Sequence, residues 1–225
     1  MHKILILKFS ALGDMVHTLP VAATLRKSLP DSHISWMVEE RFQDILEGNP
    51  DIDEVIPLRT KVWRKNWNAK SLGDILDTIK KLRQHKFDLV FDLHGLLKSG
   101  VIARLSGAPT RVGFHRKNCK EKFSTLFTNQ KAPYMAGGLH VVDMYLTLLQ
   151  TSLSKVEETK IFPLQIPEEA DKNIERFFDQ HPDLTARPVI AINPGAGFES
   201  KQWELDRFAE LADRIAKKLE SNIML

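Results

Sequence analysis

Short apolar runs alternate with longer amphipathic stretches along the first 160 residues. The runs are four to six residues long and lie at 3–8, 33–38, 54–58, 88–92 and 111–114. Runs of this kind are typical of strands that a parallel sheet buries on both faces. Between the runs, apolar residues recur at the spacing of a helix face, at 15–25, 42–47, 72–82, 96–105 and 140–153.

This alternation predicts repeated strand–helix units. Parallel neighbouring strands need a crossover connection, and a helix is the usual crossover. We therefore expect an α/β fold whose first domain, residues 1–160, is a doubly wound parallel sheet of the Rossmann type. Pro20 lies within the helical pattern at 15–25, so we expect it either to bend that helix or to start it.

A second strand–helix unit follows a stretch that contains four prolines between 163 and 188. Such a stretch suits a connection between domains. The expected elements in and after it are a charged helix at 168–179, a strand at 189–192, a loop at 193–203, a helix face within 208–219 and a strand that begins at 222. Because an independent domain usually has about 100–150 residues, we expect 161–225 to hold a linker and an incomplete second Rossmann-like domain.

Composition narrows the class of protein. The 225 residues are 43% hydrophobic and 27% charged, as in ordinary globular proteins. The net charge of +3 is too small to indicate a nucleic-acid-binding protein. The single cysteine, Cys119, excludes an internal disulfide and fits a reducing compartment. Because no apolar run is as long as a signal peptide core or a membrane span, we expect a soluble, cytoplasmic protein.

Ligands of open α/β sheets bind beyond the carboxyl ends of the strands, so the loops at that edge carry the candidate chemistry. The loop at 9–14 has a single glycine and lacks the G-x-G-x-x-G pattern of dinucleotide-binding sites. The segment 94–100 contains Lys98 and Ser99 without the preceding glycine of a P-loop. These departures disfavour a dinucleotide-dependent dehydrogenase and an ATPase.

Asp14 stands where the first strand passes into the first helix, and two interpretations are open. Its carboxylate could cap the helix by accepting backbone N–H groups. It could instead act as a general base that takes a proton from a sugar hydroxyl at the mouth of the crevice. The positive potential of a helix N-terminus favours the ionised carboxylate in either case. His17 lies one turn further on, where it either packs or shares the face of Asp14.

Two loops at the same predicted sheet edge are rich in cations. Residues 59–70 contain five cations, no acid and two tryptophans, and 116–122 are again basic. Ammonium and guanidinium groups bind carboxylates and phosphates, so these loops indicate an anionic partner that spans the crevice. The alternative is ordinary solvated surface charge. Trp63 and Trp67 would also suit stacking on nucleic-acid bases or a membrane interface.

The loop at 193–203 leads from a predicted strand into a helix. Gly195 and Gly197 let backbone amides approach a ligand, and the helix N-terminus favours anions. Ser200 and Lys201 could contact a diphosphate, whereas the simpler interpretation is a plain glycine turn. Two Rossmann-like units, one with a carboxylate and basic loops and the other with a diphosphate loop, would suit sugar transfer from a nucleotide donor.

Several segments together resemble the bacterial ADP-heptose:lipopolysaccharide heptosyltransferases of glycosyltransferase family 9. The segments are KFSALGDMVHTLP at 8–20, WMVEE at 36–40, VWRKNW at 62–67, DLHGLLKS at 92–99, NPGA at 193–196 and SKQW at 200–203. The basic tryptophan segment is most similar to heptosyltransferase I. The resemblance runs over nearly the entire chain, and the combination is more specific than any single motif.

The resemblance implies a GT-B architecture of two Rossmann-like domains, with the acceptor bound by the first and the nucleotide sugar by the second. It implies an inverting, metal-independent transfer of L-glycero-D-manno-heptose from ADP-heptose to the Kdo sugar of Kdo-lipid A, with no cofactor. By matching motif, Asp14 would be the base. The other implied contacts are Ser10 and Gly13 in the loop around the base, Arg64 and Lys65 on the acidic acceptor, and Gly195, Ser200 and Lys201 on the donor diphosphate.

The family also implies peripheral association with the cytoplasmic face of the inner membrane, where the glycolipid acceptor lies. Two alternatives stay open within this interpretation: an enzyme of the heptosyltransferase II type, which acts on a heptose acceptor, and a fragment that binds anionic glycolipid without catalysis. A binder of single-stranded nucleic acid is a third class, which salt-sensitive oligonucleotide binding would reveal. We expect no nucleic-acid partner.

Overall fold

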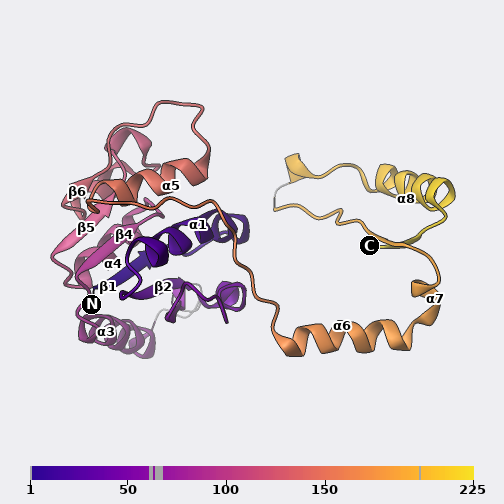
Figure 1. Ribbon diagram of the computed structural model, residues 1–225, viewed down its shortest axis with the longest axis horizontal. Helices are drawn as coiled ribbons and strands as arrows, with labels where there is room; N and C mark the ends of the chain where they lie inside the picture. The colour runs from indigo at the N-terminus through magenta and orange to yellow at the C-terminus, as the bar shows by residue number, and fades with distance from the viewer. Residues whose placement is uncertain (1, 61–62, 64–67, 198) are drawn as a thin grey trace. The chain divides into compact units, whose positions relative to one another are not determined.

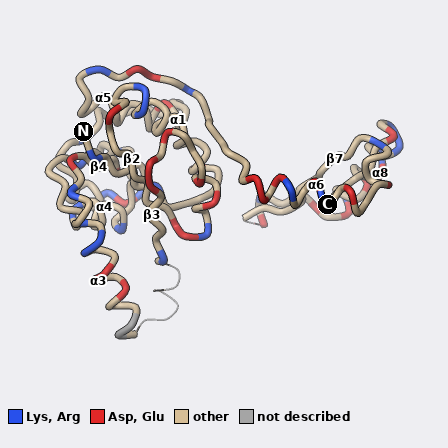
Figure 2. Tube along the Cα trace, turned by 60° about the horizontal axis from the view of Figure 1, so that its bottom comes forward, with Lys and Arg blue, Asp and Glu red and all other residues tan. Residues whose placement is uncertain are grey.

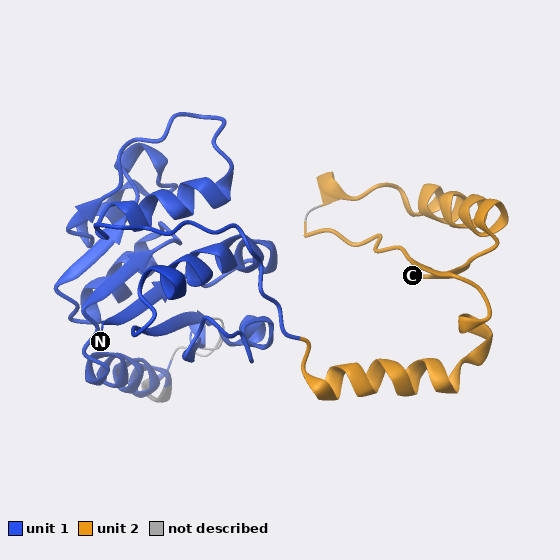
Figure 3. Cartoon of the chain, in the orientation of Figure 1, with its two compact units in different colours: residues 1–165 blue, residues 166–225 orange. Residues whose placement is uncertain are grey.

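The structure is a computed structural model, and it describes residues 2–60, 63, 68–197 and 199–225. The chain forms two compact units, residues 1–165 and 166–225, which Figure 3 colours separately. Each unit is considered by itself below. The sequence predicted a domain boundary between residues 160 and 161, and that these parts are separate folding domains stays a prediction.

Unit 1 contains a six-stranded sheet with the strand order β3-β2-β1-β4-β5-β6, and all neighbouring strands are parallel (Figure 1). The strands are β1 (Lys3–Leu7), β2 (His33–Glu39), β3 (Glu54–Leu58), β4 (Leu89–Asp92), β5 (Thr110–Gly113) and β6 (Gln130–Lys131). The chain runs outward from β1 in one direction and then, after β3, returns to β4 on the other side. This reversal beside β1 confirms the predicted doubly wound parallel sheet.

Helices connect the strands. They are α1 (Leu12–Ser28), α3 (Ala69–Gln84), α4 (Leu97–Leu105) and α5 (Val141–Gln150), with short 3₁₀ helices η1 (Glu40–Ile45), η2 (Arg116–Asn118) and η3 (Lys122–Leu126). α1 begins before the predicted range, so Pro20 lies inside the helix and does not start it. The predicted helix at 42–47 is a 3₁₀ helix, and the two-residue strand β6 was too short to leave an apolar pattern.

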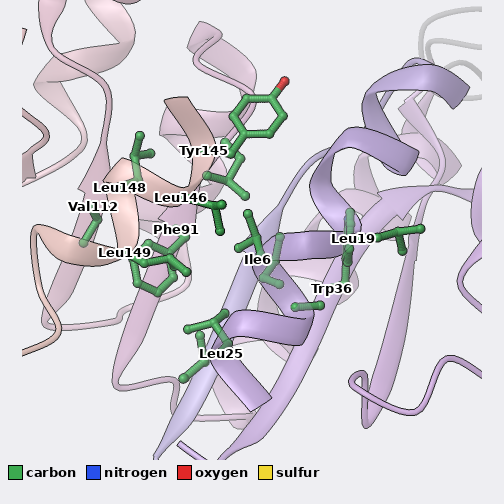
Figure 4. Packing of buried hydrophobic residues seen from close by; sticks show 14 of the residues in the cluster. Ile6, Leu19, Leu25, Trp36, Phe91, Val112, Tyr145, Leu146, Leu148 and Leu149 are labelled. Carbon is green, nitrogen blue, oxygen red and sulfur yellow. The ribbon is translucent and has the colours of Figure 1, made fainter. Parts of the chain in front are cut away.

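Apolar side chains cover both faces of the sheet. On one face, Ile4 and Ile6 of β1 pack with apolar residues of α1 and α5, which lie side by side (Figures 1 and 4). On the opposite face, Leu5 and Leu7 pack in a second cluster with apolar residues of α3 and α4. All four β1 side chains are fully buried, and burial of each such side chain is worth about 1.5–3 kcal/mol. β1 is therefore anchored from both sides.

Unit 2 consists of one strand–helix–strand unit preceded by two helices. Its elements are α6 (Glu168–Gln180), α7 (Pro182–Thr185), β7 (Val189–Ala191), η4 (Glu199–Lys201), α8 (Leu205–Leu219) and β8 (Asn222–Met224). β7 and β8 pair in parallel, as the sequence indicated. Among the residues of this unit that the structure describes, only Ala212 and Ser221 are buried. Unit 2 thus carries little core of its own.

Two helical glycines give a matched test of the packing in unit 1. A Cβ on Gly100 of α4 would lie 2.8 Å from the Ser124 carbonyl oxygen, whereas a Cβ on Gly73 of α3 would meet nothing within 4 Å. We expect Gly100→Ala to destabilise unit 1 by about 1–3 kcal/mol, because backbone of η3 must move. We expect Gly73→Ala to stabilise it by about 0.5–1 kcal/mol, because alanine is the better helix former. Urea unfolding followed by circular dichroism measures both changes, and equal effects of the two substitutions would contradict the close packing of α4 on η3.

Candidate functional site

A pocket of about 320 Å³ lies in unit 1 at the carboxyl ends of the central strands. The polar and charged side chains that line it come from the end of β1, the first turn of α1, the segments after β4 and β5, and α5; they are Lys8, Asp14, His94, Asn118, Lys120 and Tyr145. Larger pockets of about 460 and 370 Å³ lie elsewhere on unit 1. We place the candidate site in the smaller pocket because it lies at the strand ends, where ligands of doubly wound sheets bind.

Asp14 is the third residue of α1, and its side chain is 43% exposed. Its Oδ2 atom accepts a hydrogen bond from the backbone N–H of Ala11 at 3.1 Å. Ala11 holds the N-cap position, so Asp14 contributes to the cap from inside the first turn. Capping and a place in the pocket are therefore compatible, and the role of Asp14 as a base stays a prediction.

The neighbours of Asp14 take different positions. Ser10 is half-buried in the turn between β1 and α1, and Gly13 is exposed in the first turn of α1. Neither belongs to the described lining of the pocket. His17 packs edge-on against His140, with ring centroids 5.7 Å apart, which favours the packing interpretation for this histidine.

Lys8 is the most enclosed cation of the pocket, with a side chain that is 6% exposed. Its ammonium donates hydrogen bonds to the Leu93 carbonyl oxygen at 3.1 Å and to the Tyr145 hydroxyl at 2.6 Å. It also lies 3.7 Å from Oδ2 of Asp14. Burial lowers the pKa of Lys8, while the negative charges of Asp14 and Asp92 act in the opposite direction. The contacts thus join β1, the segment after β4, α1 and α5 at one cation.

Asp92, the last residue of β4, organises the turn that forms one wall of the pocket. Its carboxyl group is buried, and its Oδ1 accepts the backbone N–H groups of His94 at 3.1 Å and Gly95 at 3.0 Å. Burial raises the pKa of Asp92 to about 6, although these hydrogen bonds and Lys8 favour the charged form. Gly95 has a φ of +66°, a conformation that favours glycine. The turn therefore presents the side chain of His94 to the pocket.

His94 contributes a neutral imidazole. Its ring lies 4.9 Å from the ring of Phe9, centroid to centroid. Burial and, to a smaller extent, the nearby ammonium groups of Lys8, Lys98 and Lys120 together lower its pKa to about 3. Both ring nitrogens are buried and have no hydrogen-bond partner among the described residues. A neutral imidazole offers one donor and one acceptor, which is the pattern that a hydroxyl group requires.

Sequence reasoning did not single out Lys8, Asp92, His94 or Tyr145 as site residues. Lys8 had the clearest signal, because a lysine directly follows a buried apolar run at the predicted ligand-binding edge. Lys120 belongs to the predicted basic loop after β5, and it lines the pocket. Cys119 is half-buried beside it, and burial raises the pKa of the thiol.

Half of the basic tryptophan loop at 59–70 lies outside the described residues. Arg64 and Lys65, the predicted acceptor contacts, lie outside the described residues. Trp63 packs beside the apolar cluster that contains Leu58. Arg59 pairs with Glu40, with a closest contact of 2.6 Å, so part of the charge of this loop is already compensated.

The diphosphate loop predicted in unit 2 contains Gly195, Ser200 and Lys201. The backbone N–H of Gly195 donates to Oδ1 of Asn193 at 2.9 Å. Ser200 and Lys201 are exposed in η4. The donor-binding roles of these residues stay predictions.

Two searches of the described residues bear on other ligands. No group of three or more His, Cys, Asp or Glu side chains in this part of the chain could hold a metal ion. No helix within the described ranges has the length and apolar character that a membrane crossing requires. The predictions of metal-independent chemistry and of peripheral membrane association are not tested by these absences.

Comparison with known proteins identifies relatives over nearly the whole chain. A lipopolysaccharide heptosyltransferase 1 of Pseudomonas aeruginosa is 30% identical over 218 residues, which are 96% of this chain and 58% of the relative. A lipopolysaccharide heptosyltransferase 1 of Campylobacter coli is 29% identical over 220 residues, which are 96% of this chain and 61% of the relative. The chain thus spans about three fifths of the length of these relatives.

Solved structures agree on the fold. The crystal structure of the glycosyl transferase family 9 protein from Veillonella parvula superposes with a TM-score of 0.81 at 24% identity, and it covers 99% of this chain and 61% of that one. Escherichia coli heptosyltransferase WaaC, solved with ADP-2-deoxy-2-fluoro heptose, gives 0.73 at 25% identity over 98% and 67% of the two chains. These likenesses confirm the GT-B type of fold.

The model of glycosyltransferase family 9 (heptosyltransferase) matches residues 75–225, about two thirds of the chain. This match runs from within α3 of unit 1 to the end of unit 2. The chain therefore belongs to glycosyltransferase family 9, the heptosyltransferase family.

Proposed function

We propose that this chain takes part in heptose transfer during synthesis of the lipopolysaccharide inner core. The donor is ADP-heptose, the acceptor is the Kdo sugar of Kdo-lipid A, and the transfer is inverting and needs no metal or cofactor. Named relatives that are lipopolysaccharide heptosyltransferases support the reaction class, and the WaaC structure with an ADP-heptose analogue supports the donor. Unit 1 binds the acceptor, and the loop at 193–203 contacts the donor.

The observation that carries this proposal is the partly exposed carboxylate of Asp14 at a pocket lined by lysines. In the proposed step, the acceptor hydroxyl oxygen attacks the anomeric carbon of the heptose. The bond between that carbon and the diphosphate oxygen breaks, and ADP leaves with the electron pair. Asp14 takes the hydroxyl proton, while Lys201 and the backbone amides of its loop stabilise the charge on ADP.

The character of the pocket suits a sugar that carries negative charge. Lysine and arginine positions are interspersed with acidic ones along unit 1 (Figure 2), so cations gather only locally. Lys120 of this pocket is one such cation, and it can bind the carboxylate of a Kdo residue. His94 can exchange hydrogen bonds with a sugar hydroxyl because it stays neutral at physiological pH.

The acceptor also determines where the protein works. Kdo-lipid A is a membrane glycolipid, so the proposed enzyme acts from the cytoplasm at the inner membrane as a peripheral protein. Arg64 and Lys65 contact anionic groups of the acceptor in this proposal. A heptose acceptor, as for a heptosyltransferase II type of enzyme, would lack the Kdo carboxylate at the reacting sugar.

Asp14→Asn tests the assigned base. Asparagine keeps an oxygen that can accept the Ala11 N–H, so the helix cap survives while the proton acceptor is lost. We expect the rate of ADP release with ADP-heptose and Kdo-lipid A to fall about 10²–10⁴-fold. Asp143→Asn is the matched control, because Asp143 is also in the first turn of a helix but outside the described lining of the pocket. Near-normal turnover by Asp14→Asn would remove the assigned base.

The assay also separates the alternatives. It is run on the 225-residue chain and on any longer product of the same gene, with acceptors that end in Kdo or in heptose. Turnover only with the heptose-ended acceptor would favour the heptosyltransferase II type. Glycolipid binding without ADP release by every form would favour a non-catalytic binding protein.

Arg64→Met and Lys65→Met test acceptor recognition. We expect the KM for Kdo-lipid A to rise about tenfold in the double variant, with a smaller change in kcat, because each cation contributes binding energy outside the reacting atoms. Raising the salt concentration should weaken acceptor binding more in the unaltered protein than in the double variant. An unchanged KM would show that these two cations do not contact the acceptor.

A further inference from the structure

The two oxygens of the Asp14 carboxylate have different surroundings. Oδ2 accepts the Ala11 N–H at 3.1 Å and lies 3.7 Å from the Lys8 ammonium. Oδ1 has no partner among the described residues. The carboxylate is therefore anchored through one oxygen, and the other is left open to a ligand in the pocket.

Lys8 is itself held in place by two neighbouring protein groups. The Leu93 carbonyl oxygen lies at 3.1 Å and the Tyr145 hydroxyl at 2.6 Å from its ammonium. Tyr145 of α5 is almost wholly buried, and the centroid of its ring lies 4.7 Å from the same ammonium. An ammonium has three protons to donate, and a carbonyl and a phenol oxygen occupy two directions. The third can point to Asp14.

We propose that Lys8 is a positioning residue that fixes Asp14 through Oδ2, so that Oδ1 is the atom that takes the proton from the acceptor hydroxyl. This inference rests on the proposed function, because it assigns the geometry of the same base. Lys8 acts through Asp14 in this arrangement, because its side chain is almost wholly buried and its ammonium is already bonded to protein groups. Tyr145 in turn orients Lys8.

If Lys8 only supported the fold, its loss would not affect the chemical step alone. A carboxylate that is free to rotate loses its alignment with the hydroxyl, and misplacement by about 1 Å can cost up to about 10²-fold in rate. The acceptor still binds through its other contacts. Loss of Lys8 should therefore lower kcat and kcat/KM together and leave KM nearly unchanged.

The test compares Lys8→Met, Tyr145→Phe and Lys160→Met in the ADP-release assay. Methionine keeps much of the length and volume of lysine without its charge. Lys160→Met is the matched control, because Lys160 pairs with Asp143 at 2.5 Å and lies outside the described lining of the pocket. We expect kcat to fall about 10–100-fold in Lys8→Met, to fall less in Tyr145→Phe, where Lys8 keeps its carbonyl and carboxylate partners, and to stay unchanged in Lys160→Met.

A second measurement does not depend on turnover. With ¹³C-labelled aspartate, the carboxyl resonance of Asp14 is assigned by its disappearance in Asp14→Asn. We expect this resonance to move in Lys8→Met and Tyr145→Phe and to stay in place in Lys160→Met. If Lys8→Met does not fold, an unmoved resonance in Tyr145→Phe overturns the proposal.

Other outcomes also decide the question. A folded Lys8→Met protein with unchanged kcat, or one that changes KM alone, overturns the role of Lys8 and leaves Asp14 as the base. Normal turnover by Asp14→Asn would instead overturn the proposed function itself. Equal losses in Lys8→Met and Lys160→Met would show a general effect of charge removal and would also overturn the proposal.

Discussion

Burial of β1 on both of its faces is the constraint on which the rest of the structure depends. Alternate side chains of this strand are packed against α1 and α5 on one side and against α3 and α4 on the other. A strand enclosed in this way cannot present polar groups along its length, because each would lose its hydration without gaining a partner. The first polar side chain after the four buried residues of β1 is Lys8, directly beyond the carboxyl end of the strand, and the candidate site is built around that point.

The fold was readable from the sequence because its signals are local and repetitive. Apolar runs at 33–38 and 54–58 and the amphipathic pattern at 72–82 each indicated one element, and the rule for parallel crossovers then gave the topology. The ends of elements were less accessible. α1 starts at Leu12 although no side chain of a preferred N-cap residue precedes it, and Pro20 is accommodated inside it. Tertiary packing of α1 on the sheet outweighs these local signals.

The candidate site was only partly readable. Asp14 could be singled out because it stands where a strand passes into a helix at the ligand-binding edge of the sheet. Lys8 and Tyr145 are separated by 137 positions and meet only when α5 packs beside α1, so no local pattern joins them. Asp92 reads as an ordinary strand end, and its action on the turn at His94 depends on burial, which sequence does not show. The charges and pKa values of the site residues depend on such long-range contacts.

The contact between Asn193 and Gly195 has a consequence for the other end of the proposed reaction. The side-chain oxygen of Asn193 already occupies the N–H of Gly195, so an incoming phosphate oxygen would obtain that donor only by displacing the amide. The free energy gained when the phosphate oxygen replaces the Asn193 oxygen would be the difference between two hydrogen bonds, which is small. If the loop contacts the donor diphosphate as proposed, this one N–H would therefore add little to the retention of ADP, because Asn193 already satisfies it.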